Sequence, residues 1–210
     1  MEILKNSRIL CISPHPDDTE LGMGATLHKF RDKVAAVKLV VLSDRTMTRR
    51  EKRNRRDQKK AGEILGVTDI EFFRFPVRFF ASGRSRDRIR LRVSRIVEDF
   101  RPDVVFVPGL RETMQDHQAV AEEVVRVVLG KPSILGYEVI RHNRFFTPNC
   151  FFEVEEKNLE AKVKAVNAFS EFTNRYYFDP EVIHALARLR ATQAGYVGYA
   201  EAFEVYRLMP

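Results

Sequence analysis

Five short apolar runs alternate with longer amphipathic segments along the first two-thirds of the chain, and this alternation is what most constrains the fold. Most residues of the five short runs are apolar, as expected for strands that are buried on both faces of a sheet. The expected strands are Ile9–Ser13, Val37–Ser43, Ile70–Phe73, Val104–Pro108 and Ile134–Tyr137. Repeated strand–helix units predict an α/β fold with a mostly parallel sheet and flanking helices.

The segments between these strands have helical periodicity and end at helix-stop signals. Gly66 follows one expected helix as a C-cap, and Pro102 ends the next. After about Phe145 the pattern changes to a strand, two helices and a final apolar segment. We therefore expect a single domain over residues 1–210, with a core at 1–145 and a smaller C-terminal strand–helix–helix extension at 146–210. The expected helices are Leu21–Asp32, Arg49–Leu65, Arg88–Phe100, His117–Leu129, Leu159–Phe172 and Pro180–Arg190, and the late strands are Cys150–Val154 and Ala202–Leu208.

Composition narrows the protein class. The chain has 210 residues, 44% hydrophobic and 31% charged, which is typical of a soluble globular domain. No apolar run is long enough for a membrane helix or a signal peptide, and Cys11 and Cys150 do not indicate a disulfide framework, so we expect a cytoplasmic protein. The net charge of +7 fits nucleic acid, an anionic small substrate, or solubility alone.

Two polar clusters follow expected strands. His15-Pro16-Asp17-Asp18-Thr19-Glu20 comes after the first strand, and Asp116-His117 comes shortly after Val104–Pro108. Ligands of open α/β sheets bind beyond the carboxyl ends of the strands, so the clusters would face each other if the strands are neighbours. His15, Asp18 and His117 could then hold a zinc ion, with Asp17 as the general base for hydrolysis of an amide or ester.

A purely structural interpretation competes with this one. Adjacent aspartates at a helix start usually act as an N-cap, and a histidine that opens a helix is more often structural than metal-binding. Only the coincidence of both clusters at two strand ends favours a site.

The first cluster also resembles a known family signature. Pro14–Gly22, PHPDDTELG, resembles the HPDDxExG motif of the LmbE-like, or PIG-L, zinc-dependent N-deacetylases, and Met114–His117 lies where that family has HxDH. The resemblance implies a Rossmann-like fold and removal of an acetyl group from an N-acetylglucosamine-type sugar. It implies Zn²⁺ ligands at His15, Asp18 and His117, and catalytic roles for Asp17 and Asp116.

The chain departs from that pattern at two positions. Met114 replaces the first histidine of HxDH, which would leave Asp116 without its partner, and His142 is a candidate substitute. Asn54 takes the place of a substrate-binding arginine, so Arg53 or Arg55 could serve instead.

Other charged residues have two interpretations each. Glu138 could contact substrate hydroxyls or form an internal salt bridge. The basic run Arg45–Lys60, together with Arg84–Arg88 in an expected loop, could attract a phosphate-bearing substrate or nucleic acid. The expected partner is a small N-acetylated sugar, with nucleic acid less favoured and a homo-oligomer left open. The alternative function is a metal-containing binding protein for an anionic partner such as RNA.

Overall fold

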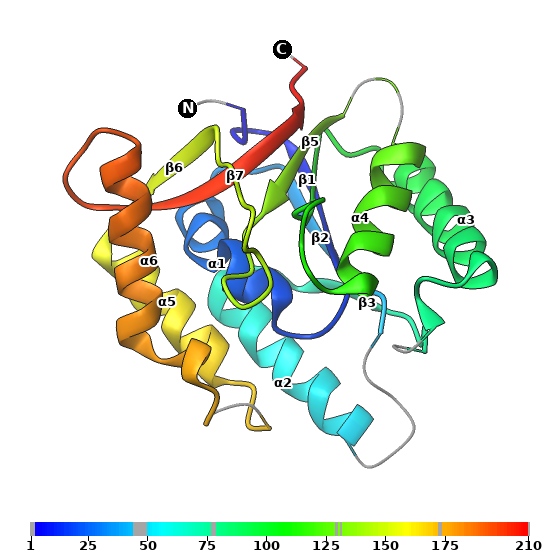
Figure 1. The fold of residues 1–210 in the computed structure, drawn as a ribbon, viewed down its shortest axis with the longest axis horizontal. Coiled ribbons are helices and arrows are strands. Elements are labelled where there is room, and N and C mark those ends of the chain that lie inside the picture. The colour runs from blue at the N-terminus through cyan, green and yellow to red at the C-terminus, as the bar shows by residue number, and fades with distance from the viewer. Residues whose placement is uncertain are drawn as a thin grey trace.

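The computed structural model describes residues 3–43, 50–76, 79–128, 130, 132–171 and 174–209. A single seven-stranded sheet runs through the middle of the molecule in the order β3-β2-β1-β4-β5-β7-β6 (Figure 1). β1 to β5 pair in parallel, and β7 and β6 extend the sheet in antiparallel pairing. The predicted mostly parallel α/β fold is confirmed. The strands are β1 (Arg8–Ser13), β2 (Ala36–Val41), β3 (Asp69–Phe72), β4 (Val104–Pro108), β5 (Ser133–Tyr137), β6 (Cys150–Val154) and β7 (Tyr199–Arg207).

Helices cover both faces of the sheet. On one face α1 packs against α5 and α2, and α6 packs beside α5; on the other face α3 packs against α4 (Figure 1). Each face has its own hydrophobic core, one including Cys11 and Phe106 and the other Leu10 and Val105. The helices are α1 (Asp18–Phe30), α2 (Arg50–Leu65), α3 (Gly83–Phe100), α4 (Gln115–Val127), α5 (Glu156–Asn167) and α6 (Pro180–Gln193), with a 3₁₀ turn η2 (Tyr176–Phe178). In the part of the chain that the structure describes, no helix has the length and apolar character needed to cross a bilayer.

The pairing of β1 with β4 positions the two polar clusters. Ile9 to Cys11 pair in register with Val104 to Phe106, so the two strands end at the same edge of the sheet. The loops that follow them lead into α1 and α4. The expectation that the two clusters face each other is therefore met.

α1 lies unusually close to the sheet at Gly22. A Cβ atom at this position would lie 2.3 Å from Cδ2 of Tyr137, a fully buried β5 residue whose hydroxyl donates to the carbonyl of Ile12 at 3.0 Å. Gly22 therefore allows close packing of the helix on the sheet.

The sequence-based expectation for Arg84–Arg88 is wrong, because these residues belong to α3 and not to a loop. Ser82 is the N-cap, and its side chain accepts a hydrogen bond from the backbone N–H of Ser85. This cap supports the first turn despite its many arginines. Of the basic run Arg45–Lys60, residues 45–49 lie outside the described residues.

The C-terminal segment completes the same sheet. β7 lies between β5 and β6, and α5 packs on α1. A buried ion pair between Lys162 of α5 and Glu201 of β7, at 2.6 Å, ties the segment together, and the Glu201 carboxylate also accepts from backbone N–H groups of α1.

Candidate metal centre

The turn between β1 and α1 is shaped by its own polar groups. The Ser13 hydroxyl donates to the carbonyl of His15 at 2.6 Å, and the backbone N–H of His15 donates to Oδ2 of Asp18 at 2.8 Å. Asp17 is the N-cap of α1 and has a left-handed backbone, with φ at 92°. A non-glycine residue there costs of the order of 1–3 kcal/mol, and such strain often occurs at functional sites. The side chains of His15, Asp17 and Asp18 are all buried.

The second half of the site comes from the start of α4. Asp116 and His117 occupy its first turn, and both are buried. The backbone N–H of His117 is held by Oδ1 of Asp116 at 3.0 Å. This places the His117 side chain opposite the β1–α1 turn.

Three ligand atoms converge between the two halves. Nδ1 of His15 lies 3.3 Å from Oδ2 of Asp18, Nε2 of His117 lies 3.3 Å from the same oxygen, and the two nitrogens are 3.3 Å apart. The three atoms thus form a nearly equilateral triangle. The sequence predicted that these three residues would share one point.

This triangle has the size that a zinc ion requires. Zinc binds imidazole nitrogen and carboxylate oxygen at about 2.0–2.2 Å, which puts neighbouring ligands of a tetrahedral ion about 3.4 Å apart. Two imidazoles and one carboxylate are also a typical catalytic zinc set, with a fourth position open. The residues present therefore fit the metal that the sequence implies.

Both histidines are backed by a carboxylate on their other nitrogen. Oδ2 of Asp116 lies 2.9 Å from Nε2 of His15, and Oε2 of Glu112 lies 2.6 Å from Nδ1 of His117. Such carboxylate–histidine pairs fix the tautomer and the ring orientation of metal-binding histidines. Asp116 is also close enough to form a metal-binding group with the two histidines, since one ligand atom from each of the three lies within 4.8 Å of the others.

The carboxylates control the charge of the imidazoles. Burial lowers the pKa of His117, but Asp18 and Glu112 outweigh burial and raise that pKa to about 9. Burial also lowers the pKa of His15, but the contacts with Asp116 and Asp18 outweigh burial, and the pKa is raised above its usual value. The raised pKa values favour positively charged imidazoles beside the buried carboxylates, and a bound cation would supply that positive charge instead.

Glu20 lies behind the turn, within α1. Its side chain is buried and accepts a hydrogen bond from Nε2 of Gln58 on α2. Burial raises the pKa of Glu20 to about 8, with Asp17 and Asp18 adding to the shift. This carboxyl group links α1 to α2 beneath the site.

Met114 and His142 lie at the border of the site. Met114 is the N-cap of α4 and is 37% exposed. His142, in the loop after β5, has its ring centre 5.1 Å from that of His117, and its carbonyl accepts from the N–H of Thr113 at 2.9 Å. The sequence suggested that Asp116 would lack an imidazole partner. That expectation is wrong, because Asp116 pairs with His15.

The structure does not bring the remaining candidate residues into contact with the ligand triangle. Glu138 is buried and makes a two-pronged ion pair with the guanidinium of Arg190 on α6. Arg53 is exposed on α2, and Arg55 lies with its guanidinium 5.2 Å from the ring centre of Phe72 on β3. Asn54 lies on the buried side of α2.

Sequence reasoning missed Glu112. This carboxylate is fully buried in the loop between β4 and α4 and contacts His117 directly. Its only sequence signal is a charged residue five positions before His117, in a loop that begins at the end of a buried strand. The proximity depends on the path of that loop, where the N–H of Glu112 turns back to the carbonyl of Gly109.

Known proteins are similar to this chain in sequence or in fold. Diacetylchitobiose deacetylase of Thermococcus kodakarensis is 29% identical over 110 residues, which make up 48% of this chain and 40% of that protein. This chain therefore matches less than half of that relative's length. The structure of N,N'-diacetylchitobiose deacetylase from Pyrococcus horikoshii, complexed with its inhibitor MPG, superimposes with a TM-score of 0.80 at 22% identity, covering 100% of this chain and 90% of that one.

The fold also carries a different reaction. GalB, the 4-carboxy-2-hydroxymuconate hydratase of Pseudomonas putida KT2440, superimposes with a TM-score of 0.79 at 18% identity, covering 97% of each chain. Likeness of fold alone therefore does not define the chemistry. The family model described as "PIG-L: GlcNAc-PI de-N-acetylase" matches residues 10–128, which span β1 to α4 and both halves of the metal centre. That match covers more than half of the chain, and the protein belongs to the PIG-L family.

Proposed function

We propose that this protein is a zinc-dependent, cytoplasmic hydrolase that removes the acetyl group from an N-acetylglucosamine-type sugar conjugate. One observation carries the proposal: three buried ligand atoms, from His15, Asp18 and His117, lie 3.3 Å from one another. A zinc ion held there would polarise the acetyl carbonyl and lower the pKa of a bound water. Its identity as zinc rests on the two imidazoles and one carboxylate.

Asp17 is the proposed general base. It follows His15 by two residues in the same turn, is buried, and is not needed for the ligand triangle. In the hydrolysis a water oxygen bonds to the acetyl carbon, the C–N bond breaks, and acetate and a free amine result. Asp17 would accept the proton of the attacking water and pass it to the leaving nitrogen.

His142 is the proposed hydrogen-bond donor in place of the missing family histidine. Burial and the charge of His117 lower its pKa to about 4, which keeps the ring neutral. A neutral imidazole still has one N–H to donate to the developing oxyanion, whereas the thioether of Met114 has none. Asp116 acts on the reaction through His15, as a positioning residue.

The substrate proposal rests on the relatives and on charge. Both relatives named as diacetylchitobiose deacetylases carry an N-acetylated sugar in their names. The exposed side of α2 adds a positive surface around one shallow depression, which is lined by five basic residues and one acidic residue: Lys52, Arg55, Arg56, Lys59, Lys60 and Glu63. This surface favours a phosphate-bearing conjugate. It also favours the second candidate function, a metal-containing protein that binds an anionic partner such as RNA.

Turnover of N-acetyl sugars by the zinc-loaded protein tests the proposal. We expect release of acetate from at least one member of a panel of N-acetylglucosamine conjugates, with and without phosphate. Asp17→Asn should keep the zinc and lower the rate by about a hundredfold to ten-thousandfold. Loss of zinc in Asp17→Asn would mean that Asp17 and Asp18 have exchanged roles. Absence of turnover in the wild type, with tight RNA binding, would favour the second function.

A further inference from the structure

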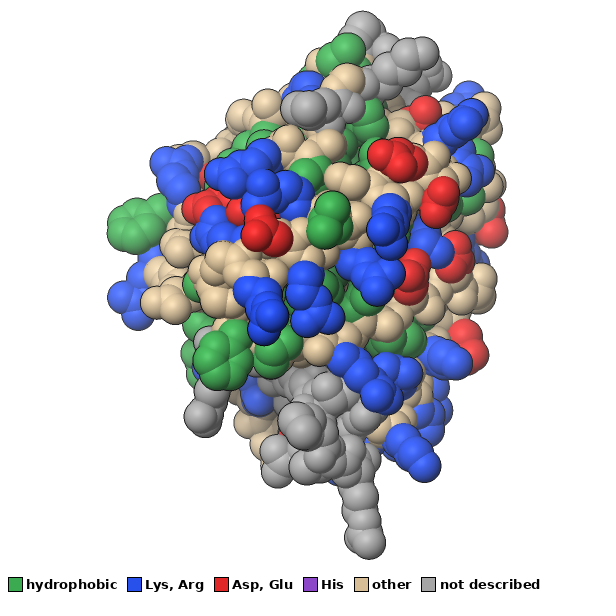
Figure 2. Space-filling model, turned by 90° about the vertical axis from the view of Figure 1, so that its right-hand side faces the viewer, with side chains coloured by type: hydrophobic (Ala, Val, Ile, Leu, Met, Phe, Trp, Pro, Cys, Tyr) green, Lys and Arg blue, Asp and Glu red, His purple; other side chains and the backbone are tan. Residues whose placement is uncertain are grey.

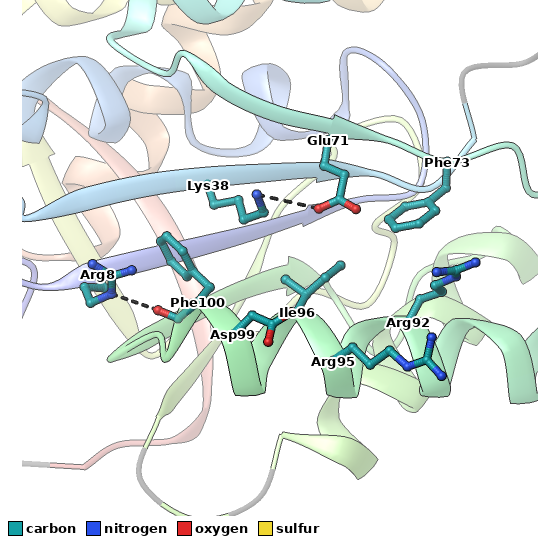
Figure 3. A pocket seen from close by; sticks show the side chains of 9 residues that line it. All are labelled: Arg8, Lys38, Glu71, Phe73, Arg92, Arg95, Ile96, Asp99 and Phe100. Atoms are coloured by element: carbon teal, nitrogen blue, oxygen red, sulfur yellow. Dashed lines mark hydrogen bonds and ion pairs between the residues drawn. The ribbon is translucent and has the colours of Figure 1, made fainter.

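A groove on the α3 face of the sheet has a lining that deacetylation does not use. It lies between α3 and the strands β1 to β3 and encloses about 350 Å³ (Figure 3). Arg8 at one end of the groove opens β1, whereas His15 follows the other end of that strand, about 17 Å away along a six-residue strand. The metal-centre residues are not among those that line the groove, so the two sites share no side chain. Its lining is Arg8, Lys38, Glu71, Phe73, Arg92, Arg95, Ile96, Asp99 and Phe100.

The groove is positively charged. Lys38 is balanced by Asp69 and Glu71 across the strands, at 3.0 and 3.6 Å. Arg92 and Arg95, and the guanidinium of Arg8, have no carboxylate within ion-pair distance among the described residues. Four cations and two carboxylates line the groove, and with Asp69, which pairs with Lys38 from outside the lining, the net charge is +1. A phosphate monoester carries about −1.5 to −2 at neutral pH, so the unpaired arginines would attract it.

Two of the arginines are held in place by aromatic rings. The Arg8 guanidinium lies 4.5 Å from the ring centre of Phe100, and its Nε donates to the Phe100 carbonyl at 2.8 Å. The Arg92 guanidinium lies 5.7 Å from the ring centre of Phe73. Both groups keep their terminal N–H donors while losing conformational freedom, which lowers the entropic cost of binding an anion.

The remaining surface of the groove suits a flat ring. Phe73, Ile96 and Phe100 supply apolar contact, and guanidinium planes stack on aromatic rings. The volume lies within the range of small-ligand pockets. One turn before Arg92, Arg88 lies 5.4 Å from the ring centre of Phe75 and extends the row of arginines along α3. Figure 2, which views the side of the molecule that includes α3, shows many Lys and Arg side chains.

We propose that this groove binds a nucleotide unit, with its phosphate on Arg92 and Arg95 and its base against the apolar wall. The same chemistry is offered by a free mononucleotide and by one residue of a single-stranded nucleic acid. The site is independent of the proposed deacetylase activity.

Calorimetric titration of the zinc-loaded protein tests the groove with three probes: adenosine 5′-monophosphate, inorganic phosphate and a single-stranded ten-residue oligoadenylate. We expect saturable binding of the mononucleotide, at least tenfold tighter than that of phosphate. The double variant Arg92→Glu/Arg95→Glu should weaken mononucleotide binding at least tenfold. Arg84→Glu is the matched control, because Arg84 is exposed on the same helix but does not line the groove. It should change the affinity by less than twofold.

The possible outcomes distinguish a free nucleotide from a nucleic acid as the ligand, and they include results that would overturn the proposal. Tighter binding of the oligoadenylate, lost in the double variant, assigns the groove to nucleic acid; weaker binding assigns it to free nucleotides. The proposal is overturned if the mononucleotide does not bind, if it binds no better than phosphate, or if Arg84→Glu and the double variant behave alike. Binding that disappears when zinc is removed would place the nucleotide at the metal centre and also overturn it. Circular dichroism and the unfolding midpoint of each variant exclude loss of the fold as the cause.

Discussion

At the scale of single residues, Glu112 gives a sharp test of the metal centre. Glu112→Gln keeps the size of the side chain but removes the charge that faces Nδ1 of His117. Loss of such a supporting carboxylate typically costs about 10–100-fold in metal affinity, and we expect a decrease of that size in competition with a chelator. Glu122→Gln is the matched control, since Glu122 lies on α4, which follows the Glu112 loop, and its carboxylate binds Arg86 at the surface instead of a histidine of the site. Equal zinc affinity in both variants would contradict the role of Glu112.

Met114 and His142 give a second test at this scale. If His142 donates to the oxyanion, His142→Ala should lower the deacetylation rate about 100–1000-fold, the usual cost of one oxyanion donor. Met114→His should then be neutral or harmful in the wild type but restore activity to His142→Ala. A gain of tenfold or more from Met114→His alone, about 1.4 kcal/mol of transition-state stabilisation, would instead show that the chain lacks a donor. Assays of the two single variants and the double variant on one N-acetyl sugar decide whether His142 is the donor or the chain lacks one.

The residues of the site differ in how far sequence could predict them. His15, Asp18 and His117 could be predicted to meet because they follow the ends of two strands that pair in parallel. Glu112 and the contact of Asp116 with His15 could not, because both depend on loop paths and on which imidazole nitrogen faces the shared point. Neither of these has a periodic signal in the sequence.

At the scale of elements, the close approach of α1 to the sheet controls the metal turn. Gly22→Ala would put a methyl group 2.3 Å from the fixed ring of Tyr137, so α1 must move away from β5. Overpacking of this kind costs about 1–3 kcal/mol, and moving α1 also displaces Asp18 at its start. We expect lower stability in urea and weaker zinc binding. Gly83→Ala, at the start of α3 with open space around it, should be neutral in both measurements.

Elements were easier to predict than their ends. β4 and β6 could be predicted to the residue because apolar runs are bounded by polar or proline residues. The start of α3 could not, since its first turn is rich in arginine and has no apolar periodicity; the cap at Ser82 decides it. The joining of β6 and β7 to the main sheet is likewise a long-range pairing that local pattern does not reveal.

At the scale of the whole molecule, the metal centre joins the two halves of the parallel sheet. His15 and Asp18 come from the loop after β1, and His117 comes from the start of α4, about a hundred residues later. Asp18, Glu112 and Asp116 are all buried beside the two imidazoles. An ion that bridges these elements binds the folded chain and not the unfolded one, so binding should stabilise the entire domain.

Removal of zinc should therefore lower the melting temperature. With free zinc at a thousand times its dissociation constant the expected stabilisation is about 4 kcal/mol, which corresponds to a shift of roughly 8–16 °C for a domain of this size. Scanning calorimetry with zinc and with a chelator measures the shift. His117→Ala removes one corner of the ligand triangle and should melt at the same temperature in both conditions. A zinc-dependent shift that persists in His117→Ala would place the ion elsewhere in the chain, and the triangle of His15, Asp18 and His117 would not be its site.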